Sequence, residues 1–179
     1  SKSKLEDYKG ALSDYNKALE INPNFANAYY NIGIVKAILE EYSEAIYYYD
    51  KAIELNLKDS IQYDNRGFAK DKIGDFEGAI KDYDLAIKIN PNVANTYNNR
   101  ANAKKSLEDY QGAIEDYGKA ISLEPESLMS YFNRGVLNKN IENTQDAIND
   151  LSKVVVLDPF FSNAYFIKGE LLLNKESDY

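Results

Sequence analysis

Two sets of polar side chains recur along this chain at one fixed spacing. Asparagine repeats every 34 residues in the row Asn31, Asn65, Asn99 and Asn133. An asparagine amide offers a donor and an acceptor, which matches the hydrogen-bonding groups of a peptide bond. The second set is Arg66, Arg100 and Arg134, each followed sixteen residues later by an aspartate. These residue types favour amide contacts to a peptide backbone and ion pairing between helices.

The composition argues against a catalytic centre built from this chain. Among its 179 residues there is no cysteine and no histidine. Their absence removes thiolate chemistry, the commonest general base and the commonest metal ligand. The chain also has no glycine-rich phosphate loop and no identifiable pair of catalytic carboxylates. We therefore expect a protein that is not an enzyme, with no catalytic residue, no metal site and no cofactor.

Charge and hydropathy limit the classes of partner. The formal net charge is −8, so the chain as a whole does not attract nucleic-acid phosphates. No apolar run approaches the 18 residues that a membrane span requires. We therefore expect neither a nucleic acid nor a membrane as the partner.

The same period of 34 residues organises the whole chain, because small and aromatic residues follow it too. Within each period, apolar residues are spaced as on two helices, separated by a polar break such as Ile73-Gly74-Asp75. A proline near the end of the period stops the second helix, and Leu57 stands at the proline place in one repeat. The main rows are Ala11, Ala45, Ala79, Ala113 and Ala147; Pro23, Pro91, Pro125 and Pro159; and Gly33, Gly67, Gly135 and Gly169, with Ala101 in the gap.

Residues 26–59 resemble the tetratricopeptide repeat family, with Tyr29, Gly33 and Ala45 at the family's conserved places. The resemblance implies an all-α, right-handed superhelical α-solenoid of antiparallel helix pairs, forming a single array over 1–179. Its expected parts are a second-helix half-repeat at 1–25, full repeats at 26–59, 60–93, 94–127 and 128–161, and a first-helix half-repeat at 162–179.

Arginine at one place of the repeat and aspartate sixteen residues later are either both present or both absent. The first repeat replaces both, with Ile32 at the arginine place and Tyr48 at the aspartate place. We infer structural ion pairs within repeats, namely Arg66–Asp82, Arg100–Asp116 and Arg134–Asp150. Pairing with the next repeat's arginine fits less well, because Tyr48 would then face Arg66. An arginine row that binds acidic ligands is the alternative.

The resemblance also implies that the first helix of each repeat lines a concave groove. The asparagine row would lie there and hold an extended peptide, or else simply solvate the groove. The predicted peptide-binding residues are Asn31, Asn65, Asn99, Asn133, Asn95, Asn98, Asn102, Lys105, Phe132, Lys139 and Phe166. Phe132 and Phe166 would form an apolar floor, and Lys105 and Lys139 a basic zone.

A carboxylate clamp for heat-shock proteins, known in this family, is not expected. The best frame keeps Asn102 and Asn133 but has Asn98, Asn163 and Ile167 where the clamp needs cations.

We therefore predict a non-catalytic scaffold that binds a protein or peptide segment. The alternatives are a substrate-recruiting arm of a larger enzyme and a self-assembling repeat protein. The chain begins with a second helix and ends with a very apolar first helix, as a cut through a longer array would. Head-to-tail self-association would cover that last helix.

Overall fold

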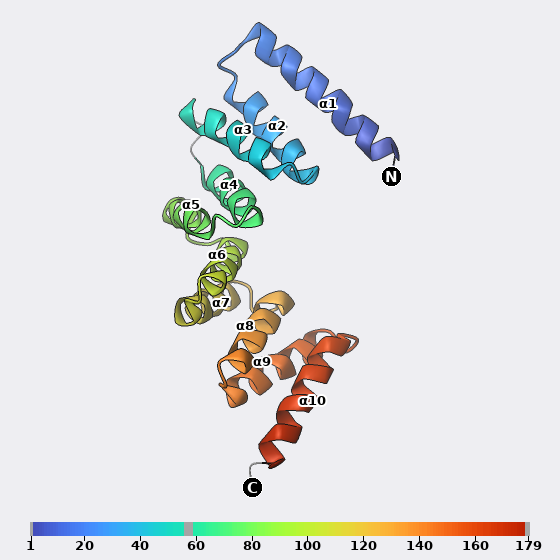
Figure 1. The fold of residues 1–179 in the computed structure, drawn as a ribbon, viewed down its shortest axis with the longest axis vertical. Coiled ribbons are helices and arrows are strands. Elements are labelled where there is room, and N and C mark those ends of the chain that lie inside the picture. Colours follow the sequence, from blue (N-terminus) through green and yellow to red (C-terminus); the bar gives the residue numbers. More distant parts are fainter. Residues whose placement is uncertain (1, 56–58, 178–179) are drawn as a thin grey trace. The chain divides into compact units, whose positions relative to one another are not determined.

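The structure, a computed structural model, describes residues 2–55 and 59–177, so Leu57 lies outside the described residues. The described residues form ten α-helices joined by turns, and no β-strand occurs among them (Figure 1). None of these helices is both long enough and apolar enough to cross a bilayer. The helices are α1 Lys2–Ile21, α2 Ala26–Ile38, α3 Tyr42–Glu54, α4 Ser60–Lys72, α5 Phe76–Ile89, α6 Ala94–Ser106, α7 Tyr110–Leu123, α8 Leu128–Asn140, α9 Thr144–Leu157 and α10 Ser162–Ser177.

The helices belong to two units, residues 1–91 with α1 to α5 and residues 92–179 with α6 to α10. In the first unit, α2 packs on α3 and α4 on α5, while α1 packs on α2 and α3 on α4. In the second unit, α6 packs on α7 and α8 on α9, while α7 packs on α8 and α9 on α10. The prediction of an all-α fold built from helix pairs is confirmed. The single continuous array over 1–179 stays a prediction.

The turn inside each pair has one recurring backbone conformation. Glu40, Glu108 and Glu142 have φ angles of 61°, 63° and 64°, and Gly74 at the equivalent place has 83°. After α2, the Glu40 amide donates to the Ala37 carbonyl at 3.0 Å. The next amide, of Glu41, donates to the Lys36 carbonyl at 2.9 Å. This is the left-handed helix end that satisfies the last carbonyls. It turns the chain back so that the second helix runs antiparallel to the first.

Side chains and prolines set the limits of the second helices. The Asp75 carboxylate accepts from the Gly78 amide at the start of α5, and Asp109 accepts from Gly112 at the start of α7, both at 3.0 Å. At the far end, Asn90 stands before a proline and has an extended backbone, with φ −135° and ψ 99°. A residue before proline avoids the helical conformation, so α5 ends there.

The core of each helix pair combines small buried residues with one large buried side chain. Ala45, Ala79, Ala113 and Ala147 are all 0% exposed. Four residues later on the same helices stand fully buried large side chains, namely Tyr49, Tyr83, Tyr117 and Leu151. A Cβ on Gly33 would lie 2.6 Å from the Tyr49 ring. The absence of a side chain at Gly33 is therefore what lets this ring fill the space between α2 and α3.

Gly33→Ala is expected to lower the free energy of unfolding by about 1–3 kcal/mol, because the added methyl overpacks a closed core. Gly169 has the same place in the pattern on α10, but nothing lies within 4 Å of a Cβ there. Gly169→Ala is the matched control and should raise stability by roughly 0.5–1 kcal/mol through helix propensity. Urea denaturation measures both variants. Equal effects of the two substitutions would contradict this packing account.

Candidate functional site

In the first unit, the predicted groove residue Asn65 on α4 contacts the neighbouring repeat. Its Nδ2 donates to the Tyr30 hydroxyl on α2 at 2.8 Å. The Tyr30 ring lies 5.8 Å from the ring of Tyr49. Burial and then the charge of Asp59 raise the pKa of Tyr30, while the hydrogen bond from Asn65 lowers it. Asn65 is thus oriented by a neutral hydroxyl, and its Oδ1 is left to accept from another donor.

A cavity of about 410 Å³ lies beside Asn65, between α2, α3 and α4. Its walls are mainly apolar, and the Tyr42 and Phe68 rings meet edge to face with centroids 6.4 Å apart. Ile38 at its border is 51% exposed. The lining residues are Ile34, Ala37, Ile38, Glu40, Tyr42, Tyr49, Asn65 and Phe68. Such a cavity can accept an aliphatic or aromatic side chain next to an amide.

In the second unit, two predicted groove asparagines are bonded within the protein. Asn98 Nδ2 donates to the Ser130 hydroxyl at 2.8 Å, which links α6 to α8. Asn102 Oδ1 accepts from the Tyr117 hydroxyl at 2.6 Å, which links α6 to α7. The Oδ1 atom of Asn98 is buried with no hydrogen-bond partner. These amides therefore connect helices first, and only part of their capacity is left for a ligand.

The remaining predicted groove residues differ in how accessible they are. Phe132 is half-buried, with its ring 4.9 Å from that of Phe161, so it contributes to the core rather than to an open floor. Lys139 pairs with Glu170 at 2.7 Å, and Phe166 is 68% exposed. Asn31, Asn99, Asn133 and Lys105 are half-buried, and Asn95 is exposed.

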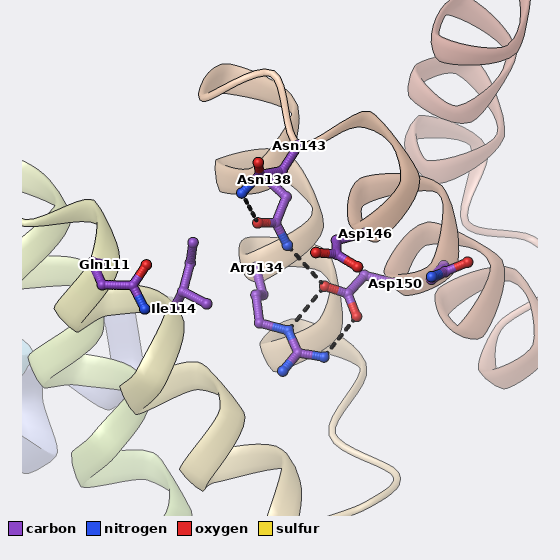
Figure 2. A pocket seen from close by; sticks show the side chains of 8 residues that line it. Gln111, Ile114, Arg134, Asn138, Asn143, Asp146 and Asp150 are labelled. Carbon is purple, nitrogen blue, oxygen red and sulfur yellow. Dashed lines mark hydrogen bonds and ion pairs between the residues drawn. The ribbon is translucent and has the colours of Figure 1, made fainter. Parts of the chain in front are cut away.

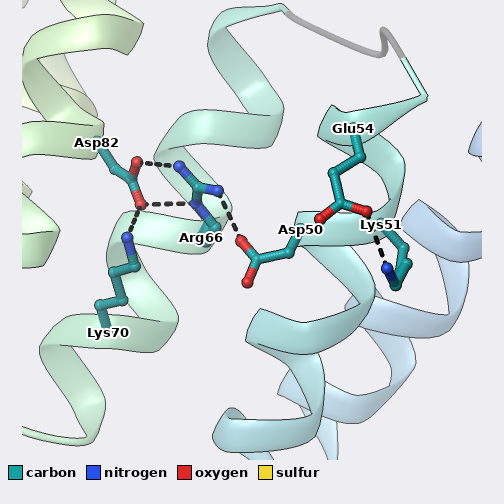
Figure 3. A network of polar contacts seen from close by, with 6 residues as sticks. All are labelled: Asp50, Lys51, Glu54, Arg66, Lys70 and Asp82. Carbon is teal, nitrogen blue, oxygen red and sulfur yellow. Dashed lines mark hydrogen bonds and ion pairs between the residues drawn. The ribbon is translucent and has the colours of Figure 1, made fainter.

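The structure places each arginine of the repeated set against the aspartate of its own repeat. Arg66 on α4 donates through Nε at 2.8 Å and through Nη2 to the two oxygens of Asp82 on α5 (Figure 3). Its third nitrogen, Nη1, donates to Asp50 on α3 at 2.6 Å. The Lys70 ammonium lies 2.8 Å from Asp82, which is only 2% exposed. One buried carboxylate thus holds two cations.

The third and fourth repeats have related but unequal networks. Arg100 Nε donates to Asp116 at 2.8 Å, and Lys104 adds an ammonium at 2.8 Å. Arg134 donates through Nε and Nη2 to Asp150 at 2.9 and 2.8 Å, with an asparagine where the lysine would stand. The three guanidinium groups also lie over tyrosine rings of their own helices, at 5.6, 5.5 and 6.0 Å from the centroids.

Three members of these networks, Lys70, Lys104 and Asp50, were missed by the sequence reasoning. Lys70 and Lys104 belong to a lysine row that begins with Lys36, and that recurrence was a usable signal. Asp50 lies two residues after the aspartate place, in a row that is interrupted by Gly118. In the first repeat, Ile32 is 1% exposed and the Tyr29 and Tyr48 rings are 6.4 Å apart. An apolar contact replaces the ion pair there.

A second cavity, of about 430 Å³, borders the last network in the second unit (Figure 2). It lies among α7, α8 and α9, away from the predicted groove places. Its lining residues are Gln111, Ile114, Arg134, Asn138, Asn143, Asp146, Asn149 and Asp150. No group of three or more acidic, histidine or cysteine side chains suited to a metal ion occurs in the part of the chain that the structure describes.

Comparison with protein families identifies the fold. Residues 4–37 and 72–108 match a family described as "TPR repeat", and residues 26–59 and 94–127 match "Tetratricopeptide repeat". The chain belongs to the tetratricopeptide repeat family. The repeat at 26–59 has the same boundaries as the one predicted from the sequence. No curated protein matches this tetratricopeptide repeat chain.

Solved structures of other repeat proteins share the α-solenoid architecture. YrrB, described as "a TPR protein with an unusual peptide-binding site", superposes with a TM-score of 0.82 at 23% identity, covering 93% of this chain and 86% of YrrB. MamA from Desulfovibrio magneticus RS-1 gives 0.83 at 22% identity, covering 87% and 88%. The first repeat domain of Spaghetti (RPAP3), bound to an HSP90 peptide, gives 0.63 at 21% identity, covering 65% and 93%.

Asp82→Asn is expected to cost on the order of 3–5 kcal/mol of stability, because it leaves the half-buried Arg66 and Lys70 without their shared carboxylate. Asp150→Asn should cost less, because Asp150 holds one cation and the Arg134 side chain is 24% exposed against 15% for Arg66. Chemical denaturation of the two variants measures the difference. A larger loss for Asp150→Asn would contradict this ranking.

Proposed function

We propose that this tetratricopeptide repeat protein is a non-catalytic scaffold that binds an extended segment of a partner protein on its first helices. The observation that supports this most strongly is the apolar cavity of about 410 Å³ beside Asn65. Five of its lining residues lie on α2 and α4, the first helices of their repeats, which the family resemblance assigns to the groove. They are Ile34, Ala37, Ile38, Asn65 and Phe68.

The chemistry of the cavity fits one apolar side chain and the peptide backbone next to it. Ile34, Ile38 and Phe68 would surround an aliphatic or aromatic anchor, whose burial drives binding. Asn65 Nδ2 is engaged by Tyr30, so Asn65 Oδ1 would accept from a backbone N–H of the ligand. The bond to Tyr30 fixes the amide before binding, which lowers the entropic cost of association.

The asparagine row would extend the contact along the first helices of each unit. The side-chain amides of three asparagines make no hydrogen bond to the other described residues. These asparagines are Asn31, Asn99 and Asn133. Their donors and acceptors are therefore open to a peptide backbone. Asn98 and Asn102 would position neighbouring helices instead, because both are bonded within the second unit.

The solved relatives support a peptide as the class of partner. YrrB is described with a peptide-binding site, and the Spaghetti (RPAP3) domain was solved with an HSP90 peptide. This chain has Asn98, Asn163 and Ile167 where a heat-shock carboxylate clamp has cations. We therefore propose a ligand that is held by an apolar anchor and backbone contacts rather than by its terminal carboxylate.

Ile38→Glu tests the cavity, with peptides selected from a display library on the wild-type chain as ligands. The substitution puts a charge at the cavity's border, so we expect affinity to fall about tenfold or more by fluorescence anisotropy. Ile89→Glu is the control, because Ile89 is similarly exposed at 48% on α5 and outside the cavity lining. Equal affinities for Ile38→Glu and the wild type would refute the proposed site.

Self-association is the second candidate, supported by the apolar surface of α10. Tyr165, Phe166, Leu172 and Leu173 on this helix are 48%, 68%, 44% and 68% exposed. A second copy docking head to tail would cover them. Sedimentation should then give a mass that rises with concentration, and Phe166→Ser with Leu173→Ser should keep the chain monomeric. A wild-type chain that stays monomeric at high concentration would exclude this candidate.

A further inference from the structure

The second unit contains two equivalent ion-pair networks, one around Asp116 in the third repeat and one around Asp150 in the fourth. In the third repeat, the Lys104 ammonium lies 2.8 Å from Oδ2 of Asp116. Thirty-four residues later, the matching aspartate is Asp150 and the matching lysine place holds Asn138. Lys70 repeats the contact in the first unit, at 2.8 Å from Oδ2 of Asp82. The fourth repeat thus keeps the carboxylate and lacks the ammonium.

The asparagine does not replace the missing ammonium well. Asn138 is 3% exposed, yet its Nδ2 reaches Asp150 Oδ2 only at 3.5 Å. Its Oδ1 accepts from Asn143, also at 3.5 Å. Both separations are at the outer limit of a hydrogen bond, so this buried amide is weakly satisfied. Figure 2 shows Asn138, Arg134 and Asp146 arranged around the buried carboxylate of Asp150.

The charged side chains that line this cavity carry a net negative charge, so the cavity can accept one more cation. Arg134 is the single basic residue of its lining, and Asp146 and Asp150 are both acidic. At the place of Asp146, the second and third repeats have Gly78 and Gly112. Compared with the second and third repeats, the fourth repeat therefore has one more carboxylate at the place of Asp146 and one lysine fewer at the place of Asn138. Two carboxylates and four amide side chains supply oxygens that accept hydrogen bonds from a cation. The negative charge of the carboxylates would repel an anion.

We propose that this cavity binds the side-chain ammonium of a lysine from a partner protein. The ammonium would stand where Lys70 and Lys104 place theirs, against Oδ2 of the aspartate, with Asp146 as the second carboxylate. Its three donors match the surrounding oxygens of Asp146, Asp150 and the amides. The chain's net charge of −8 would speed the approach of a basic partner. This site lies outside the proposed peptide groove and goes beyond that function.

NMR on the 179-residue chain tests the site with acetyl-glycyl-lysyl-glycinamide as the probe. The side-chain amides of Asn138 and Asn143 should shift in a saturable way at low salt. The same peptide with an acetylated lysine, and the glutamate peptide, should give no saturable shift. The arginine peptide should bind more weakly, because the internal group at this place is an ammonium in two repeats. Saturation by the acetylated peptide, or equal binding of arginine, would overturn the assignment.

Three variants separate charge from folding. Asp146→Asn removes an exposed carboxylate and should weaken lysine binding about threefold, whereas Asp146→Glu should keep it. Asn138→Lys supplies the ammonium internally and should reduce binding about tenfold or more while the fold remains stable. Circular dichroism verifies the fold of each variant. Unchanged affinity in either Asp146→Asn or Asn138→Lys would overturn the proposal.

Discussion

The close approach of two helices within each repeat is the constraint on which the other features depend. Alanines that are 0% exposed face the first helix, and a large side chain four residues later fills the remaining space. Gly33 lies so near the Tyr49 ring that a Cβ would come within 2.6 Å. Because this contact sets the spacing and rotation of each pair, it also decides which residues of the first helix face outward. The candidate binding surface follows from the core.

Ion pairs between arginine and aspartate also join the two helices of the second, third and fourth repeats. Asp82 is almost fully buried, yet it is paired with Arg66 and Lys70, which offsets the cost of desolvation. The first repeat solves the same packing problem with Ile32 and a pair of tyrosine rings. The repeats therefore share a backbone and differ in chemistry. The apolar cavity occurs beside the first repeat and the polar one beside the fourth.

The helix pairs and the pairing of arginine with aspartate inside a repeat could be foreseen, because both rest on residue types that recur with one period. Partners such as Asp50 were missed, because its row is broken by Gly118 and its contact crosses between repeats. Phe132 was expected in an open groove, but its ring lies against Phe161. The orientation of such a side chain depends on which neighbouring side chain packs against it, and the 34-residue repeat pattern does not specify that neighbour. The groove itself remains a proposal.

In the first unit, we propose that the first helices receive a peptide side chain in the cavity beside Asn65. Intermolecular nuclear Overhauser effects, measured between the chain and a bound selected peptide, test it most directly. Contacts are expected from an apolar peptide side chain to the methyl groups of Ile34 and Ile38, with a shift of the Asn65 side-chain amide. Contacts confined to exposed residues of the second helices, such as Tyr47 and Leu85, would contradict it.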